Sequence, residues 1–213
     1  MPRKAVIANL RVPVRSRPAE AAASRLKQAR EREKAGRLPQ ALLLLEQALA
    51  AGPKDATVLS RLGETLLALG RLPEALSRFD SALALDPNRA MVWNNRGAVL
   101  LASGQAEAAL QSFEQALGLQ PDAADIWLNH GNTLQKLGRL ENATASYRQA
   151  LRHRPAFAEA CYRLATVFSA LKRSEDALHE VTRALTLQPG RRLAIARCTL
   201  PRVTPTRRSP EKF

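Results

Sequence analysis

The sequence predicts an all-α protein built as a right-handed α-solenoid of five helix-turn-helix repeats. The first observation behind this prediction is that the chain aligns with itself every 34 residues from Ala22 onward, without an insertion. The second is composition, because the strong helix formers Ala and Leu dominate while aromatic residues make up only 4%. The third is that Gly and Pro recur at fixed places. The predicted repeats are residues 22–55, 56–89, 90–123, 124–157 and 158–191.

Small side chains recur where the two antiparallel helices of one repeat must approach each other closely. Position eight of the repeat holds Ala29, Gly63, Gly97, Gly131 and Ala165. Position twenty holds Ala41, Ala75, Ala109, Ala143 and Ala177, and position twenty-seven is also Ala in every repeat. Position twenty-four is larger, and we expect it to fill the space between one helix pair and the next; it holds Leu45, Phe79, Phe113, Tyr147 and Val181.

Turn residues separate the predicted helices. Position fifteen is glycine in four repeats, because the left-handed backbone that ends a helix favours it: Gly36, Gly70, Gly104 and Gly138. Lys172 takes this position in the fifth repeat, so we expect that turn to be the least regular. Pro39 and Pro73 stand where a second helix would begin, and a missing N–H costs little there. Position thirty-two is Pro in all five repeats and is expected to end the second helix.

The excess positive charge of the chain lies at its two ends. Residues 1–37 carry a net charge of +8 and residues 191–213 carry +6, while residues 38–190 are neutral. We expect residues 1–21 to be a basic, disordered segment, residues 192–200 to form a short capping helix, and residues 201–213 to be a disordered basic tail. The neutral middle argues against nucleic acid as the main partner.

The sequence gives no support for catalysis. It has no Gly-rich phosphate loop, no carboxylate pair placed in a cleft and no nucleophile with a suitable base. Cys161 and Cys198 cannot form a disulfide framework, and the three histidines lack metal-ligand spacing. We therefore expect no enzyme activity, no cofactor and no metal. No run of eighteen apolar residues is present, so we expect no transmembrane segment and a cytoplasmic location.

The blocks resemble the tetratricopeptide repeat (TPR) over residues 22–191, with Trp93 and Trp127 at its fourth position. Asn95 and Asn129, at position six of consecutive repeats, are similar to the TPR region of O-linked N-acetylglucosaminyltransferases and their Spindly-like bacterial relatives. The catalytic region of those enzymes would need several hundred more residues. The carboxylate clamp of chaperone-binding members is rejected, because Asn94 and Glu159 occupy two of its sites.

The resemblance also implies where a ligand would bind, because TPR proteins use a concave groove lined by the first helices. An Asn amide there can donate to and accept from an extended peptide backbone. We expect Asn95 and Asn129 to point into that groove together, and Trp93 and Trp127 to be wedged in the core. The groove candidates are Arg61, Glu64, Asn94, Asn95, Asp125, Asn129, Asn132, Gln135, Tyr162 and Arg163.

Three functions stay open at this point. The favoured one is a scaffold or adaptor that holds an extended peptide or a partner helix in the groove. The second is a truncated or regulatory substrate-targeting arm of a glycosyltransferase-like enzyme. The third is polyanion binding through the basic ends, which lack the interleaved aromatics of a base-stacking surface. The identity of the partner and the oligomeric state do not follow from the sequence.

Overall fold

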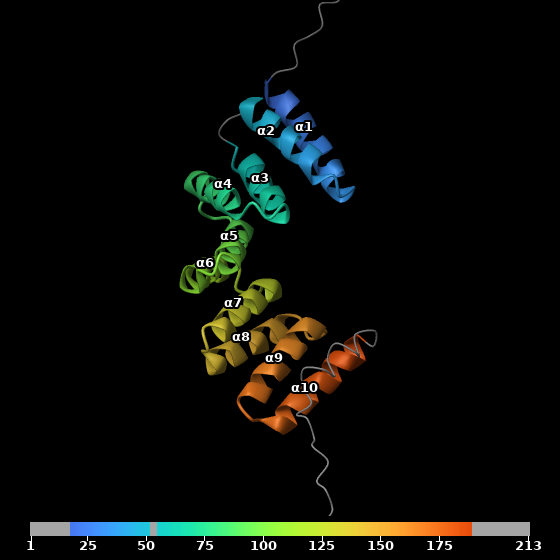
Figure 1. Ribbon diagram of the computed structural model, residues 1–213, viewed down its shortest axis with the longest axis vertical. Helices are drawn as coiled ribbons and strands as arrows, with labels where there is room; N and C mark the ends of the chain where they lie inside the picture. Colours follow the sequence, from blue (N-terminus) through green and yellow to red (C-terminus); the bar gives the residue numbers. More distant parts are fainter. Residues whose placement is uncertain (1–17, 52–54, 189–213) are drawn as a thin grey trace, which may run out of the picture.

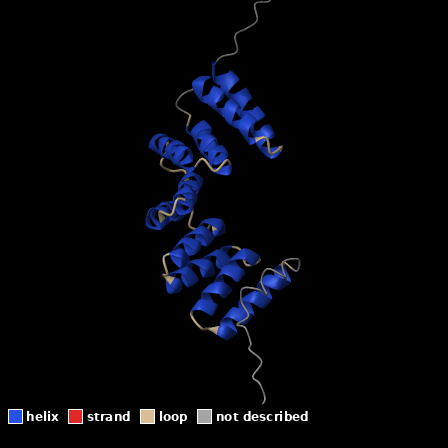
Figure 2. Cartoon of the chain, in the orientation of Figure 1, coloured by secondary structure: helices blue, strands red, loops and turns tan. Residues whose placement is uncertain are grey.

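The computed structural model describes residues 18–51 and 55–188, and within these ranges the chain is entirely helices and connecting turns, without a strand (Figures 1 and 2). The expectations for residues 1–17, 192–200 and 201–213 lie outside the described residues. The helices are α1 (Pro18–Lys34), α2 (Leu38–Ala51), α3 (Ala56–Ala68), α4 (Leu72–Leu85), α5 (Ala90–Ala102), α6 (Ala106–Leu119), α7 (Ala124–Lys136), α8 (Leu140–His153), α9 (Ala158–Ala170) and α10 (Ser174–Leu187).

The helices pack in chain order, which confirms the α-solenoid. Each repeat is a pair, from α1–α2 to α9–α10, and the second helix of one pair packs on the first helix of the next. Successive first helices also contact each other, α3 with α5, α5 with α7, and α7 with α9. The stack is curved in Figure 1, where the end pairs α1–α2 and α9–α10 lie to the right of the middle pair α5–α6.

The helix boundaries follow the 34-residue register in four of the five repeats. Helices α3, α5, α7 and α9 all begin at position one, where the residue is Ala. Helix α1 is the exception, because it begins at Pro18, four residues ahead of Ala22. Residues 18–21, which were expected to belong to the N-terminal segment, therefore form its first turn. Pro is compatible with a first turn, where its missing N–H would have no helical partner.

A small residue facing a large one holds the two helices of each repeat together. Phe79, Phe113 and Tyr147 at position twenty-four are fully buried. A Cβ atom added to the glycine at position eight of the same repeat would lie 2.5–2.8 Å from the nearest ring carbon. The first and fifth repeats carry Ala at position eight, and their partners are the smaller Leu45 and Val181. The combined size of the two side chains is therefore similar in all repeats. An aromatic ring faces a glycine in the middle three repeats, and a smaller aliphatic side chain faces an alanine in the first and fifth.

The turn of the fifth repeat is regular, so the expectation for Lys172 was wrong. Lys172 has φ of 59°, close to the 69–82° of the four glycines at position fifteen. Its N–H bonds to Ser169 O, and the next N–H, of Arg173, bonds to Phe168 O. Gly70 and Arg71 make the equivalent two bonds in the second repeat. The two hydrogen bonds therefore hold a lysine in a conformation that usually favours glycine.

The two tryptophans lie between repeats but keep part of their surface in solvent. Trp93 and Trp127 are half-buried, and each packs against two of the three hydrophobic clusters of the core. Each indole Nε1–H donates to the carbonyl of the position-thirty-two proline before it, at 2.8 Å from Pro87 O and from Pro121 O. Each ring thus fixes the loop that leads into its own repeat.

Replacing Gly97 by Ala tests the small-against-large contact. We expect the free energy of unfolding to fall by about 1–3 kcal/mol, because the new methyl group overpacks the buried Phe113 ring. The measurement is chemical denaturation. Adding Phe113→Leu, which imitates the first repeat, should recover part of the loss, so that the double variant is more stable than the sum of the two changes predicts.

Gly118→Ala is the matched control, because Gly118 lies in α6 and no atom stands within 4 Å of an added Cβ. This change should raise stability by roughly 0.5–1 kcal/mol through helix propensity. A Gly97→Ala variant as stable as Gly118→Ala would show that the ring yields and that the contact is not tight.

Candidate functional site

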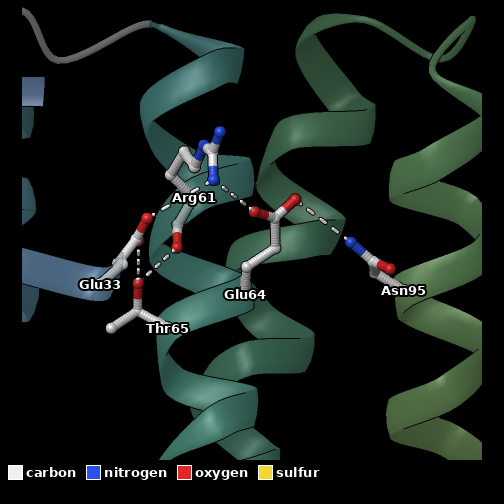
Figure 3. Close-up of polar contacts among 5 residues, drawn as sticks. All are labelled: Glu33, Arg61, Glu64, Thr65 and Asn95. Atoms are coloured by element: carbon white, nitrogen blue, oxygen red, sulfur yellow. Dashed lines mark hydrogen bonds and ion pairs between the residues drawn. The ribbon is translucent and has the colours of Figure 1, made fainter. Parts of the chain in front are cut away.

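The face made by successive first helices carries polar side chains that the core does not use. Helices α3, α5, α7 and α9 each contact the next member of this series. Residues at equivalent positions therefore lie within hydrogen-bond reach although about one repeat separates them in the sequence. Figure 3 shows part of the result, a series of contacts that passes from α1 through α3 to α5.

The series begins with one arginine between two glutamates. Arg61 Nη1 lies 3.5 Å from Glu33 Oε2 and 3.3 Å from Glu64 Oε2 (Figure 3). Thr65 Oγ1 donates to the other oxygen of Glu33 at 2.8 Å. The side chains of Arg61 and Glu64 keep about a third of their surface exposed (34% and 37%). This end of the series is thus held by charge and remains open to solvent.

Asparagines continue the series into the third and fourth repeats. Asn95 Nδ2 donates to Glu64 Oε1 at 3.3 Å, and Asn94 Nδ2 donates to Asn95 Oδ1 at 3.3 Å. Asn129 Nδ2 then donates to Asn94 Oδ1 at 2.9 Å. We call this connected set the polar ladder; its members are Glu33, Arg61, Glu64, Asn95, Asn94 and Asn129. It crosses four consecutive repeats.

The geometry between the asparagines differs from the expected pair. Asn95 and Asn129 were expected to point into one groove together. Asn94, which is only 8% exposed, lies between them and bonds to both. Asn95 and Asn129 are half-buried. Part of their hydrogen-bonding capacity therefore holds the repeats together, and only the remainder can face a ligand.

The charges of the ladder are not balanced, because two carboxylates share one guanidinium. Burial raises the pKa of Glu64, and the neighbouring Glu33 carboxylate raises it further, while the positive charges of Arg61 and Arg30 and a hydrogen bond from Ser60 act in the opposite direction. The α1–α3 end of the ladder is therefore its charged part, while the α5–α7 end consists of neutral amides.

Two other candidates form a separate cluster around a core residue. Tyr147 Oη lies 2.9 Å from both Asn132 Oδ1 and Gln135 Oε1, and Gln135 Nε2 donates to Thr166 Oγ1 at 3.4 Å. Burial raises the pKa of the Tyr147 hydroxyl, so it remains a neutral hydrogen-bond donor. Asn132 and Gln135 thus satisfy a buried hydroxyl, and this cluster links α7, α8 and α9.

The last three candidates do not join the polar ladder. Arg163 Nε donates to Glu159 Oε1 at 2.9 Å within α9, and Tyr162 is half-buried on the same helix. Asp125 accepts two hydrogen bonds from Arg154, which precedes the fifth repeat. That ion pair joins a first helix to the loop of the next repeat.

Sequence reasoning missed Glu33 and the polar role of Tyr147. Glu33 lies at position twelve of the first repeat, and all of the groove candidates came from the second to fifth repeats. Tyr147 was assigned to the core by its position alone. Its hydroxyl was the available signal, because a buried tyrosine hydroxyl needs a polar partner.

One arrangement on the other side of the repeats resembles a catalytic triad but is built for structure. His130 Nδ1 lies 2.9 Å from Ser146 Oγ, and His130 Nε2 lies 4.0 Å from Glu114 Oε1. Ser146 is 2% exposed and donates its own proton to Asn142 O at 3.0 Å. With the hydroxyl proton directed to Asn142 O, His130 Nδ1 is placed to donate to Ser146 Oγ, and the contact links α7 to α8. In the repeat before, Arg96 donates to Ser112 in the same way.

Family models identify the repeats. Two models described as tetratricopeptide repeat match residues 33–97 and 128–192, and one described as TPR repeat matches residues 99–138. The chain therefore carries tetratricopeptide repeats across these residues. No curated protein matches the chain in sequence.

Solved structures share the fold. MamA from Desulfovibrio magneticus RS-1 has a TM-score of 0.74 at 23% identity, over 80% of this chain and 96% of that one. A thermophilic TPR protein in Thermus thermophilus has a TM-score of 0.68 at 26% identity, over 84% and 98%. YrrB, described as a TPR protein with an unusual peptide-binding site, has a TM-score of 0.69 at 23% identity, over 85% and 93%.

None of the helices in residues 18–51 and 55–188 is long and apolar enough to cross a membrane. Within the same ranges, no group of three or more His, Cys, Asp or Glu side chains is arranged to hold a metal ion.

Replacing Glu64 by Gln tests the electrostatics of the polar ladder. The raised pKa means that the folded state binds a proton more tightly than the unfolded state, so this group lowers stability as the pH rises above the ordinary glutamate range. The neutral Gln removes that loss. We expect the stability of Glu64→Gln relative to the natural chain to increase between about pH 4 and pH 7, measured by denaturation at several pH values.

Glu74→Gln gives the opposite sign and serves as the control. Hydrogen bonding to Arg71 lowers the pKa of Glu74, so this carboxylate favours the folded state as the pH rises. A stability difference for Glu64→Gln that does not change with pH would mean that Glu64 is solvated like a surface residue.

Proposed function

We propose that this protein is an interaction scaffold that binds an extended segment of a partner protein along the polar ladder. The observation that carries the proposal is the continuity of the ladder across α1, α3, α5 and α7. Most of its members are only partly buried, so they are available to a ligand on that face. A row of polar groups on neighbouring helices suits a ligand that is itself extended and polar.

The ladder has hydrogen-bonding capacity left over for such a ligand. Asn129 Oδ1 accepts no hydrogen bond within residues 18–51 and 55–188, and Arg61 uses only Nη1 in the contacts described above. An exposed peptide backbone offers one N–H and one C=O per residue, and amides and guanidinium groups can bond to these whatever the side chains are. YrrB, which shares this fold, is described as having a peptide-binding site, and this supports a peptide as the class of ligand.

The glycosyltransferase-like targeting arm, polyanion binding and the cellular location remain predictions. A targeting arm of a glycosyltransferase-like enzyme would bind its substrate through the same asparagines, and only repeats three and four carry Asn at position six. Polyanion binding would depend on the basic residues 1–17 and 191–213, which lie outside the described residues. We propose a non-catalytic role, and a location in the cytoplasm of a bacterium stays a prediction.

The proposal is tested by selecting, from a displayed library of random peptides, those that bind to the whole protein. We expect Asn95→Ala/Asn129→Ala to weaken binding of the selected peptide roughly fivefold or more, because each lost hydrogen bond is worth about 0.5–1.5 kcal/mol. The measurement is calorimetric titration. Because Asn94 loses its partner when Asn129 is replaced, the variant should also be less stable, by about 1–3 kcal/mol, so titrations are run well below its melting temperature.

Gln111→Ala/Gln115→Ala is the matched control, because it removes two exposed amides from α6, a second helix. This variant should bind the peptide like the natural chain. The proposal fails if the α6 change weakens binding while the asparagine change does not.

A further inference from the structure

Helix α10 presents apolar side chains that have no covering helix among the described residues. Leu178, at position twenty-one of the fifth repeat, is 65% exposed. The equivalent residues Leu42, Leu110 and Thr144 are 8%, 7% and 4% exposed, and Leu76 is half-buried. Leu178 therefore lies at a position that is normally inside the stack.

The neighbouring positions on α10 show the same change. Val181 at position twenty-four is only half-buried, whereas the residues at this position in the other four repeats are fully buried. In those repeats the second helix packs against the first helix of the next repeat, as α8 does against α9. We call Leu178, Val181 and Leu185 the terminal face. Its residues stand at positions of a second helix, and in the other four repeats the second helix packs against the next first helix.

The chain continues in register with such a helix. The 34-residue spacing places position one of a sixth block at residue 192. In α9 the residues at positions three, four and seven pack back into the core with the fourth repeat: Ala160, Cys161 and Leu164. The same positions of the sixth block hold Ala194, Ile195 and Cys198. Pro201 at position ten would stop a helix there.

We propose that residues 192–200 of this chain dock on the terminal face as the first helix of an incomplete sixth repeat. A segment joined to α10 by a few residues has a high effective concentration at this face. A second molecule would have to compete with it through three side chains, far less than the roughly 800 Å² per partner that a stable interface buries.

Thiol labelling of the whole protein tests this proposal, because the two cysteines report on different places. Cys161 is fully buried in α9, and burial raises the pKa of its thiol to about 11, so it stays unlabelled while the protein is folded. Cys198 would face α10 in the docked segment. With a neutral maleimide and mass spectrometry, we expect Cys198 to react at least about tenfold more slowly than in the urea-unfolded chain.

Leu178→Ser should remove this protection and bring the Cys198 rate to within about threefold of the unfolded rate. Leu43→Ser is the matched control, because Leu43 is also an exposed leucine on a second helix (56%) but lies outside the terminal face; its Cys198 rate should equal that of the natural chain. Both variants are checked for an unchanged helical spectrum and an unlabelled Cys161.

Two results would overturn the proposal. Cys198 that reacts at the unfolded rate in the natural chain would mean that the segment does not dock. Protection that disappears on dilution, together with a change in sedimentation, would assign the terminal face to a second copy of the chain. Neither result bears on peptide binding by the polar ladder, so the two proposals can fail separately.

Discussion

The contact between a small residue at position eight and a large residue at position twenty-four is the constraint on which the rest of this solenoid depends. A Cβ atom added at Gly97 would lie 2.8 Å from a ring carbon of Phe113, so the absence of a side chain at this position is what lets the buried ring pack against the backbone of α5. This contact uses one side of each first helix. The opposite side then takes no part in the core, and polar residues such as Arg61 and Asn95 can occupy it.

The polar ladder is a consequence of that regular stacking. Glu64 and Asn95 are 31 residues apart, and Asn94 and Asn129 are 35 apart, yet each pair is joined by a hydrogen bond. Such contacts are possible only when successive first helices keep the same spacing and rotation. Asn94 makes the ladder more than a surface feature, because a nearly buried amide must find partners and so links α5 to α7. The side chains that we propose to bind a ligand are therefore also the ones that link neighbouring repeats.

The fold could be predicted because residue size at a few positions decides it. Gly63, Phe79 and the glycines at position fifteen recur every 34 residues in the sequence, and in the structure they form the helix contacts and the turns. Lys172 was misjudged because two backbone hydrogen bonds outweigh the preference of its side chain. The site was harder to predict. The repeat register identified Arg61, Asn95 and Asn129, but register does not say which partner a flexible side chain selects. It therefore missed Glu33, and it placed Asn132 in the groove although Asn132 bonds to Tyr147.

The central claim is that the leftover hydrogen-bonding capacity of the ladder faces a ligand. The most direct measurement is the set of side-chain amide signals of the asparagines and glutamines in nuclear magnetic resonance spectra, recorded as a display-selected peptide is added. We expect the Asn95 and Asn129 NH₂ signals to shift in proportion to the bound fraction, while those of Gln111 and Gln115 on α6 stay in place. Shifts confined to Gln111 and Gln115, with the ladder amides unchanged at saturation, would contradict it.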